Sequence, residues 1–191
     1  MRRSTPIRSD KIEIAILRVG PVDGEVVENV QRGLRRVFPG AACGVLEDVM
    51  PVPQGAYNVA RGQYHSSRIL TGILGYVERS GANCVLGITK VDLYVPPLNF
   101  VFGEAKCPGG AAIVSLCRLR SEFYGQPTDQ DLFLERSAKE AVHEVGHTLG
   151  LRHCRNPACV MSFSNNIQMV DAKECKFCER CRKEVIATLR T

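Results

Sequence analysis

The chain has 191 residues, 45% of them hydrophobic, which allows one domain with a full core or one domain with a small appendage. It contains no run of about 18 apolar residues, which excludes a membrane-spanning helix. The net charge of +5 comes from interspersed charges of both signs, so it permits acidic partners but indicates neither nucleic acid nor a membrane surface.

The amino-terminal half predicts alternating strands and helices. Alternation and isoleucines mark Lys11–Val19 as a strand, and Ala42–Val52 fits a second, weaker strand closed by Pro51 and Pro53. Helical periodicity marks Val22–Phe38 and Ser66–Val77 as helices. The near-continuous apolar run Cys84–Tyr94 predicts a strand buried on both faces.

The second half predicts short strands followed by a long helix. Phe100–Phe102 and Ala111–Leu116 fit strands, and Ser121–Gln130 fits a polar loop. Apolar spacing predicts a helix over Leu132–Leu149 and a last helix over about Cys178–Leu189. This order predicts an α/β fold in which helices pack on a mixed sheet.

We expect one compact domain over residues 11–191, preceded by a flexible tail at residues 1–10. Residues 11–153 supply the sheet and helices. Residues 154–191 are rich in cysteine and poor in apolar side chains. This part is therefore not expected to form a core alone and needs a stabilising cross-link such as a bound metal. Although the chain begins Met1-Arg2-Arg3, the apolar segment of a signal peptide does not follow, which favours a cytoplasmic protein.

Three of the four histidines lie between positions 143 and 153. His143 and His147 are four residues apart, so a helix places both on one face, where they can bind one zinc ion. Gly150 allows the chain to leave the helix and return His153 to the same ion. Glu144 follows the first histidine and points beside the metal, where it can act as general base on a zinc-bound water. The alternative is a helix whose histidines face solvent or satisfy buried polar groups.

Five of the nine cysteines form a second cluster. The pairs Cys154/Cys159 and Cys178/Cys181 could form a four-thiolate structural zinc site. Cys175 forms an overlapping Cys-x-x-Cys pair with Cys178 and is interpreted as a spare thiol. Reduced thiols or a redox disulfide are the alternative. The other cysteines are expected to be small core residues: Cys43, Cys84, Cys107 and Cys117.

The segment from Ala141 to Lys183 resembles the archaemetzincins, a group of the metzincin clan of zinc metallopeptidases. It carries His-Glu-Val-Gly-His-Thr-Leu-Gly-Leu-Arg-His-Cys, then Cys-Val-Met, then Cys-x-x-Cys. The resemblance implies a zincin-like fold, an intracellular protein without a pro-segment, and two zinc ions. It implies these roles: catalytic zinc at His143, His147 and His153, general base Glu144, Met-turn residue Met161, and structural zinc at Cys154, Cys159, Cys178 and Cys181. Cys175 stays an alternative ligand, because the gap between Met161 and Cys178 is slightly shorter than in the family pattern.

The predicted function is hydrolysis of peptide bonds in a peptide or protein, by a chain that is expected to be a monomer. One alternative is a two-zinc module with little turnover that binds protein or nucleic acid. Another is hydrolysis of an amide other than a peptide bond. Residues Tyr94–Phe102 could form a rim that pairs with an extended substrate. Tyr124 could stabilise an oxyanion or could merely be packed.

Overall fold

A computed structural model describes residues 12–38 and 40–188. The predicted tail at residues 1–10 and the predicted element ends at Lys11 and Leu189 lie outside the described residues. The main elements are β1 (Glu13–Val19), α1 (Gly24–Val37), β2 (Ala42–Met50), β3 (Tyr57–Asn58), β4 (Gln63–His65), α2 (Ser66–Ser80), β5 (Cys84–Thr89), β6 (Leu93–Tyr94), β7 (Gly103–Ala105), β8 (Ala111–Ser115), α3 (Gln130–Thr148), α4 (Ile167–Ala172) and α5 (Glu179–Thr188). No helix within these described stretches has the length and hydrophobicity needed to cross a membrane.

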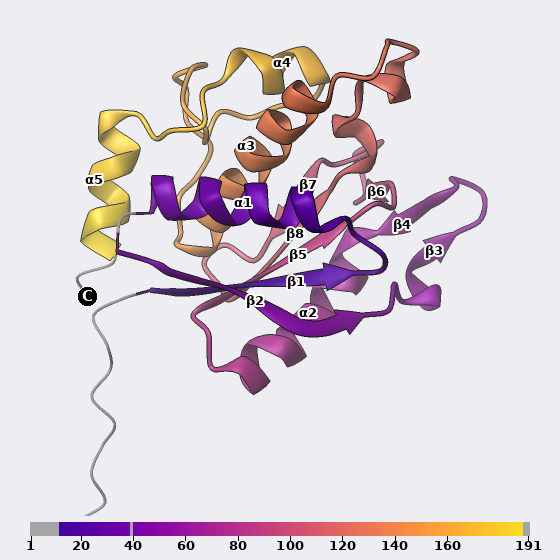
Figure 1. The fold of residues 1–191 in the computed structure, drawn as a ribbon, viewed down its shortest axis with the longest axis horizontal. Coiled ribbons are helices and arrows are strands. Elements are labelled where there is room, and N and C mark those ends of the chain that lie inside the picture. Colours follow the sequence, from indigo (N-terminus) through magenta and orange to yellow (C-terminus); the bar gives the residue numbers. More distant parts are fainter. Residues whose placement is uncertain (1–11, 39, 189–191) are drawn as a thin grey trace, which may run out of the picture.

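The main sheet has five strands in the order β2-β1-β5-β8-β7 (Figure 1). Strands β2, β1, β5 and β8 run parallel, and β7 is antiparallel to β8 at the edge. Strands β3, β4 and β6 form a small second sheet. This mixed sheet with packed helices confirms the predicted fold class.

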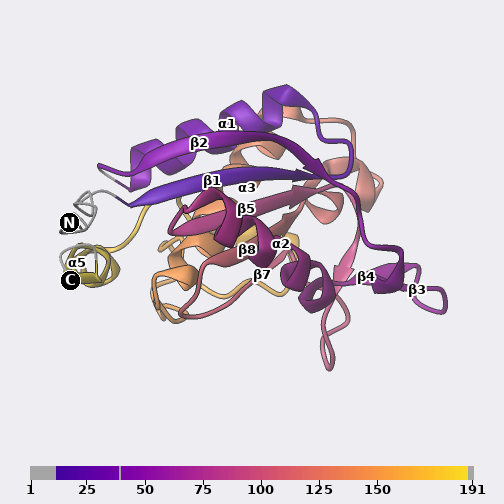
Figure 2. The ribbon, with the colours of Figure 1, turned by 90° about the horizontal axis from the view of Figure 1, so that it is seen from below.

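Alternation along the strands gives the sheet two buried faces. On β1, Ile14 and Ile16 belong to the core beneath α1 and α3, while Ala15 and Leu17 belong to the core beneath α2. Since successive side chains of a strand point to opposite faces, one apolar strand supplies both cores. Figure 2 shows α1 and α2 on opposite sides of the sheet.

The prediction of one strand over Cys84–Tyr94 is wrong. The run contains two strands, Cys84–Thr89 and Leu93–Tyr94, which belong to different sheets. The chain bends between them, and Asp92 there accepts two hydrogen bonds of 2.7 Å from Arg118. The partly buried ion pair therefore anchors the bend that separates the strands.

Other predicted boundaries differ from the structure more modestly. The strand expected at Phe100–Phe102 lies at Gly103–Ala105. The expected polar loop Ser121–Gln130 contains a short 3₁₀ helix over Ser121–Tyr124 and the first residue of α3. Strands β3 and β4 and helix α4 were not predicted, because each is too short to show a periodic apolar pattern.

The cysteine-rich carboxy-terminal part shares the core of the α1–α3 face. Several of its apolar side chains are buried there: Val160, Met161, Ile167, Val170 and Val185. Figure 1 shows α4 at the top of the view, above α3, and α5 at the left-hand side. The part of the chain with few apolar residues is thus placed against the apolar surface built by earlier elements.

Candidate active site and metal centres

Helix α3 carries the first histidines, and both of its ends are fixed locally. The Asp129 side chain accepts a hydrogen bond of 2.9 Å from the Leu132 backbone N–H, which caps the first turn. After Thr148, Gly150 adopts φ +90°, a left-handed conformation that favours glycine. The chain can therefore reverse sharply and return His153 toward the helix.

The structure brings the three predicted histidines together. The candidate ligand nitrogens of His143, His147 and His153 all lie within 4.8 Å of one another. The Nδ1–H of His143 donates to the Val160 carbonyl at 2.8 Å, and that of His147 donates to the Leu151 carbonyl at 2.6 Å. Because each carbonyl can only accept, both rings carry their proton on Nδ1 and leave Nε2 bare.

The two bare nitrogens fit a metal ion. Nε2 of His143 and Nε2 of His147 lie 3.0 Å apart, a repulsive contact between lone pairs unless a cation lies beside both. Tetrahedral Zn–N bonds near 2.0 to 2.1 Å would place such nitrogens about 3.3 Å apart. The backbone carbonyls of Val160 and Leu151 lie where the outer partners of metal-binding imidazoles are found, and they would fix the orientation of both rings toward an ion.

Burial keeps these imidazoles neutral, as metal ligation requires. Burial is the largest cause that lowers the pKa of His143, which falls well below its usual value, and Lys173 contributes next. Burial also lowers the pKa of His147 and His153. The donor set is therefore available to a cation at neutral pH.

Glu144 is buried beside the histidines, with 5% of its surface exposed. Burial raises the pKa of its carboxyl group well above the usual value, Glu140 adds to the rise, and Lys173 opposes it. A carboxyl group with a raised pKa suits a residue that must take up and release a proton. Such a group beside candidate metal ligands is typical of a catalytic site.

Gly103 of β7 makes room for Glu144. A Cβ at this position would lie 2.6 Å from Cγ and Oε1 of Glu144 and 2.6 Å from the Ile113 carbonyl oxygen. We expect Gly103→Ala to lower catalytic activity about tenfold or more and to cost about 1–3 kcal/mol of stability, because the backbone oxygen cannot move aside cheaply. Thermal unfolding and peptide cleavage would be measured together.

Gly44→Ala on β2 is the matched control, because a Cβ there meets no atom within 4 Å. Equal activity and stability in the Gly103→Ala and Gly44→Ala variants would contradict the proposed crowding of Glu144.

The histidines and Glu144 open into a cavity of about 500 Å³. Much of one wall comes from the segment before β7, including Val95 and residues 98–102, which is the segment predicted to form a rim. Phe163 packs on His153 with ring centroids 5.0 Å apart. Tyr124 is not among the residues that line this cavity, which argues against the oxyanion role; the residue is 38% exposed, and its hydroxyl donates to the Arg118 carbonyl at 2.9 Å.

Cys107 differs from the expectation of a small core residue. Its side chain is exposed and lines the cavity beside the histidines. Its thiol donates to the Leu151 carbonyl at 3.6 Å, the same oxygen that accepts from His147. The turn around Pro108 places it outside the sheet, whereas Cys43 and Cys84 are buried as predicted.

The second predicted cluster is also brought together in space. The sulfur atoms of Cys154, Cys159, Cys178 and Cys181 all lie within 4.8 Å of one another. Those of Cys154 and Cys178 are 3.7 Å apart, too far for a disulfide and close to the edge of about 3.8 Å in a tetrahedral Zn–S₄ site. Cys175 is not part of this group.

Nearby donors favour the thiolate form of Cys178, whereas burial raises the pKa of the Cys159 and Cys181 thiols. A backbone hydrogen bond from Cys181 is the largest cause that lowers the pKa of the Cys178 thiol to about 7. The Cys178 backbone N–H donates to the Cys159 sulfur at 3.3 Å, and Arg180 donates to the Cys154 sulfur at 3.4 Å. Such donors stabilise thiolates, which are the form that binds metal.

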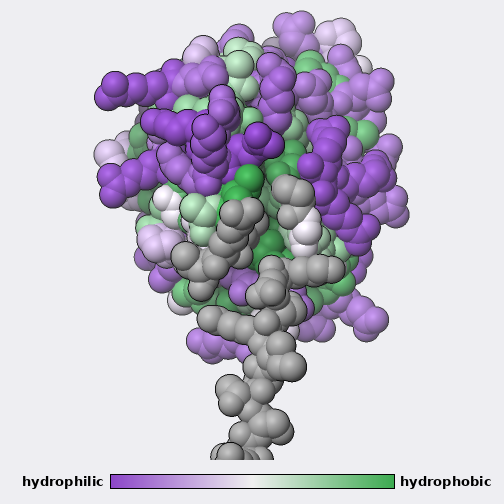
Figure 3. Space-filling model, turned by 90° about the vertical axis from the view of Figure 1, so that its left-hand side faces the viewer, coloured by the Kyte–Doolittle hydropathy of each residue, from purple (hydrophilic) through white to green (hydrophobic). Residues whose placement is uncertain are grey.

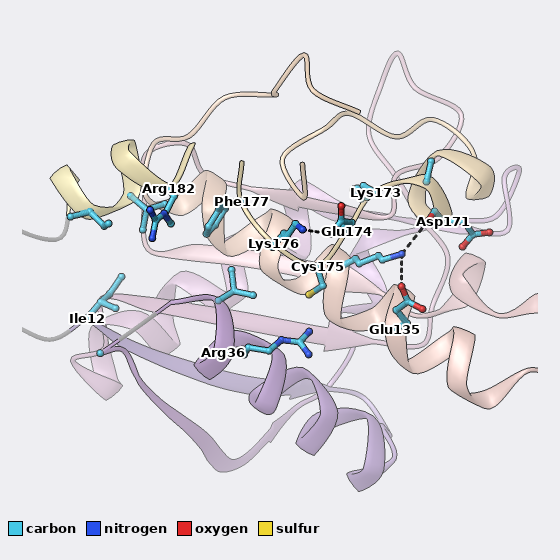
Figure 4. Close-up of a pocket in the computed structure, with 16 residues that line it drawn as sticks. Ile12, Arg36, Glu135, Asp171, Lys173, Glu174, Cys175, Lys176, Phe177 and Arg182 are labelled. Carbon is cyan, nitrogen blue, oxygen red and sulfur yellow. Dashed lines mark hydrogen bonds and ion pairs between the residues drawn. The ribbon is translucent and has the colours of Figure 1, made fainter. Parts of the chain in front are cut away.

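A larger cavity of about 1090 Å³, lined by none of the three clustered histidines or the four clustered cysteines, lies between the end of α1, α3, the 171–177 segment and α5 (Figure 4). Apolar atoms are visible between charged side chains on the side of the molecule where α5 lies (Figure 3). Cys175 lines this cavity, but none of the three histidines does. This larger cavity therefore lacks the three-histidine donor set that lines the smaller one.

A sequence profile of peptidase family M54 matches residues 23–187. The chain belongs to peptidase family M54. It is 45% identical to the archaemetzincin of Methanocaldococcus jannaschii over 174 residues, which cover 91% of this chain and 93% of that protein.

Solved structures agree with the M54 assignment. The fold matches the archaemetzincin of Methanopyrus kandleri with a TM-score of 0.83 and 33% identity, covering 98% of this chain and 100% of that one. It matches a zinc-dependent peptidase of Methanocorpusculum labreanum with a TM-score of 0.80 and 30% identity, covering 90% and 99%. The resemblance to archaemetzincins and the predicted class, a zinc metallopeptidase, are thereby confirmed.

Some residues of the M54 site were not predicted from the sequence. They include Gly103, Glu140 and Lys173, which surround Glu144 from other elements or from the preceding turn. Of these three residues, only Glu140 could have been found from the sequence, because a charged residue four positions before Glu144 lies on the same helix face. The outer partners of the histidines are backbone carbonyls, which carry no residue-type signal at all.

Proposed function

We propose that this M54 protein hydrolyses peptide bonds by attack of a water molecule that Glu144 deprotonates. The observation that carries the proposal is the convergence of bare imidazole nitrogens, 3.0 Å apart for His143 and His147, beside a buried carboxyl group in an open cavity. A zinc ion held by His143, His147 and His153 would acidify water and polarise the substrate carbonyl.

The chain's own residues would perform the proton transfers. Glu144 accepts the proton of the attacking water and delivers it to the leaving amine, so it ends the cycle in its starting state. Burial raises the pKa of the Glu144 carboxyl group. Its protonated form is therefore stable enough to exist as an intermediate of the reaction. The carbonyls of Val160 and Leu151 hold two of the imidazoles in the ligating orientation.

A second zinc ion would be held by Cys154, Cys159, Cys178 and Cys181, with Met161 as the Met-turn residue beneath the three-histidine centre. Met161 is fully buried, and its sulfur packs against Gly146 of α3. A closed four-thiolate site has no open position and stabilises the fold rather than the reaction. Free thiols fit a reducing compartment, so we place the protein in the cytoplasm. We propose that it is a monomer and acts on peptides or proteins.

Metal content per chain tests the two-site proposal. The native protein is expected to hold two zinc ions, and His147→Ala is expected to hold one, because two nitrogen ligands do not retain zinc tightly. His65→Ala is the matched control, since His65 lies on β4 outside both clusters. Element analysis that finds one zinc in all three proteins would leave the three-histidine centre without a tightly bound metal and would favour the interaction-module alternative.

A further inference from the structure

Charged side chains join α3 to the segment that ends α4. Arg136 donates to both carboxylate oxygens of Asp171, at 2.6 and 2.7 Å. Lys139 donates to the Asp171 carbonyl at 3.2 Å, and Lys173 pairs with Glu140 at 2.7 Å. Figure 4 shows Asp171 and Lys173 beside the larger cavity, while Glu140, the partner of Lys173, lines the active-site cavity.

The pair of Lys173 and Glu140 is the most deeply buried part of this contact. The Lys173 side chain is 0% exposed and that of Glu140 is 3% exposed. Buried ion pairs are seldom more stabilising than apolar residues of similar size, because both charges lose their hydration. Stability alone is therefore a weak reason for a charged pair at this position.

Glu140 belongs to the wall of the active-site cavity. It lies on α3 one turn before Glu144, and it lines the same cavity as Glu144 and the histidines. Two buried carboxylates four residues apart on one helix face repel each other. The Lys173 ammonium compensates the charge of Glu140, so Glu144 faces a neutral pair.

Lys173 also contacts the Met turn. Its ammonium donates to the Ser162 carbonyl at 3.4 Å, directly after Met161. The Cys154 backbone N–H donates to the Met161 carbonyl at 2.8 Å, which continues this connection to the residue after His153.

We propose that Lys173 and Glu140 are a positioning pair for the hydrolytic centre. Lys173 holds the Met turn against α3, and Glu140 offsets its positive charge beside the three-histidine site. The proposal rests on the proposed function above, since it assigns the pair to that centre. Neither residue is proposed to touch the substrate.

The test compares Glu140→Gln, Lys173→Met and the double variant. Zinc affinity of the three-histidine site is measured by competition with a chromophoric chelator, and kcat and KM are measured with excess zinc. Glu140→Gln is expected to weaken zinc binding about tenfold, because it leaves a buried ammonium uncompensated, an effect typical of outer partners of a metal site. The double variant is expected to recover zinc affinity but to keep a kcat about tenfold low with an unchanged KM, because the tether to Ser162 is lost.

Two controls separate this role from a general effect on folding. The exposed pair Glu179 and Lys183, 2.8 Å apart on α5, is neutralised in the same way and should change neither zinc affinity nor kcat. If Glu140→Gln does not fold, Glu140→Asp replaces it: the shorter side chain lengthens the 2.7 Å contact with Lys173, so the ammonium is less well compensated and zinc binding should still weaken.

Wild-type zinc affinity in Glu140→Gln, or in Glu140→Asp where that replaces it, would overturn the proposal, as would wild-type kcat in the double variant. If the native protein cleaves no peptide, the proposed function fails, but the zinc-affinity measurement still decides whether the pair acts on the site.

Discussion

Glu144→Gln is expected to lower peptide cleavage about 1000-fold while zinc stays bound, because an amide cannot accept the proton of the attacking water. The amide keeps the size of the carboxyl group, so the contact with Gly103 is preserved. Zinc content should be unchanged, since the candidate ligands are the three clustered histidines and Glu144 is not one of them. The measurement is kcat together with zinc per chain.

Glu78→Gln on the exposed face of α2 is the control for this substitution, and it should behave like the native protein. Turnover that persisted in Glu144→Gln would remove Glu144 as the base. Loss of zinc along with turnover would mean that Glu144 contributes to metal binding instead.

Cys178→Ser is expected to release the second zinc ion and to lower the melting temperature by about 10 °C or more. Structural zinc sites contribute directly to folding free energy, and a loss of about 4 kcal/mol corresponds to such a shift in a chain of this size. The affected segment contributes Val160, Met161 and Val185 to the core, so its release would expose apolar surface. Thermal unfolding and element analysis measure both effects.

Cys175→Ser is the matched control, three positions earlier in the chain and outside the four-sulfur cluster. It should keep both zinc ions and the native melting temperature. The opposite pattern, with zinc lost from Cys175→Ser and kept by Cys178→Ser, would make Cys175 the ligand.

Residues that meet through local geometry were predictable from the sequence. His143 and His147 share a face because a helix places residues four apart together, and Gly150 allows the turn that returns His153. The cysteines were predictable because the spacing of the two pairs is typical of zinc ligands. Apolar periodicity likewise located the longer helices, including Gly24–Val37 and Gln130–Thr148.

Features that depend on distant partners were not predictable. The bend at Asp92 depends on Arg118, 26 residues later, so an apolar run gave no sign that the strand ends. Lys173 was not predicted near the active site, because its contact with Glu140 depends on how the segment that follows α4 packs against α3. A single sequence shows which residues have the right chemistry, but tertiary packing decides which of them meet.

The loop from His153 to Met161 belongs to both candidate metal centres at once. His153 and Cys154 are consecutive, Cys159 immediately precedes Val160, and the Val160 carbonyl orients His143. The same loop is closed by the bond from the Cys154 N–H to the Met161 carbonyl. A designer who transplanted the three histidines to another scaffold would therefore have to carry the thiols with them, since the catalytic geometry is built on a loop that the cysteine cluster shapes.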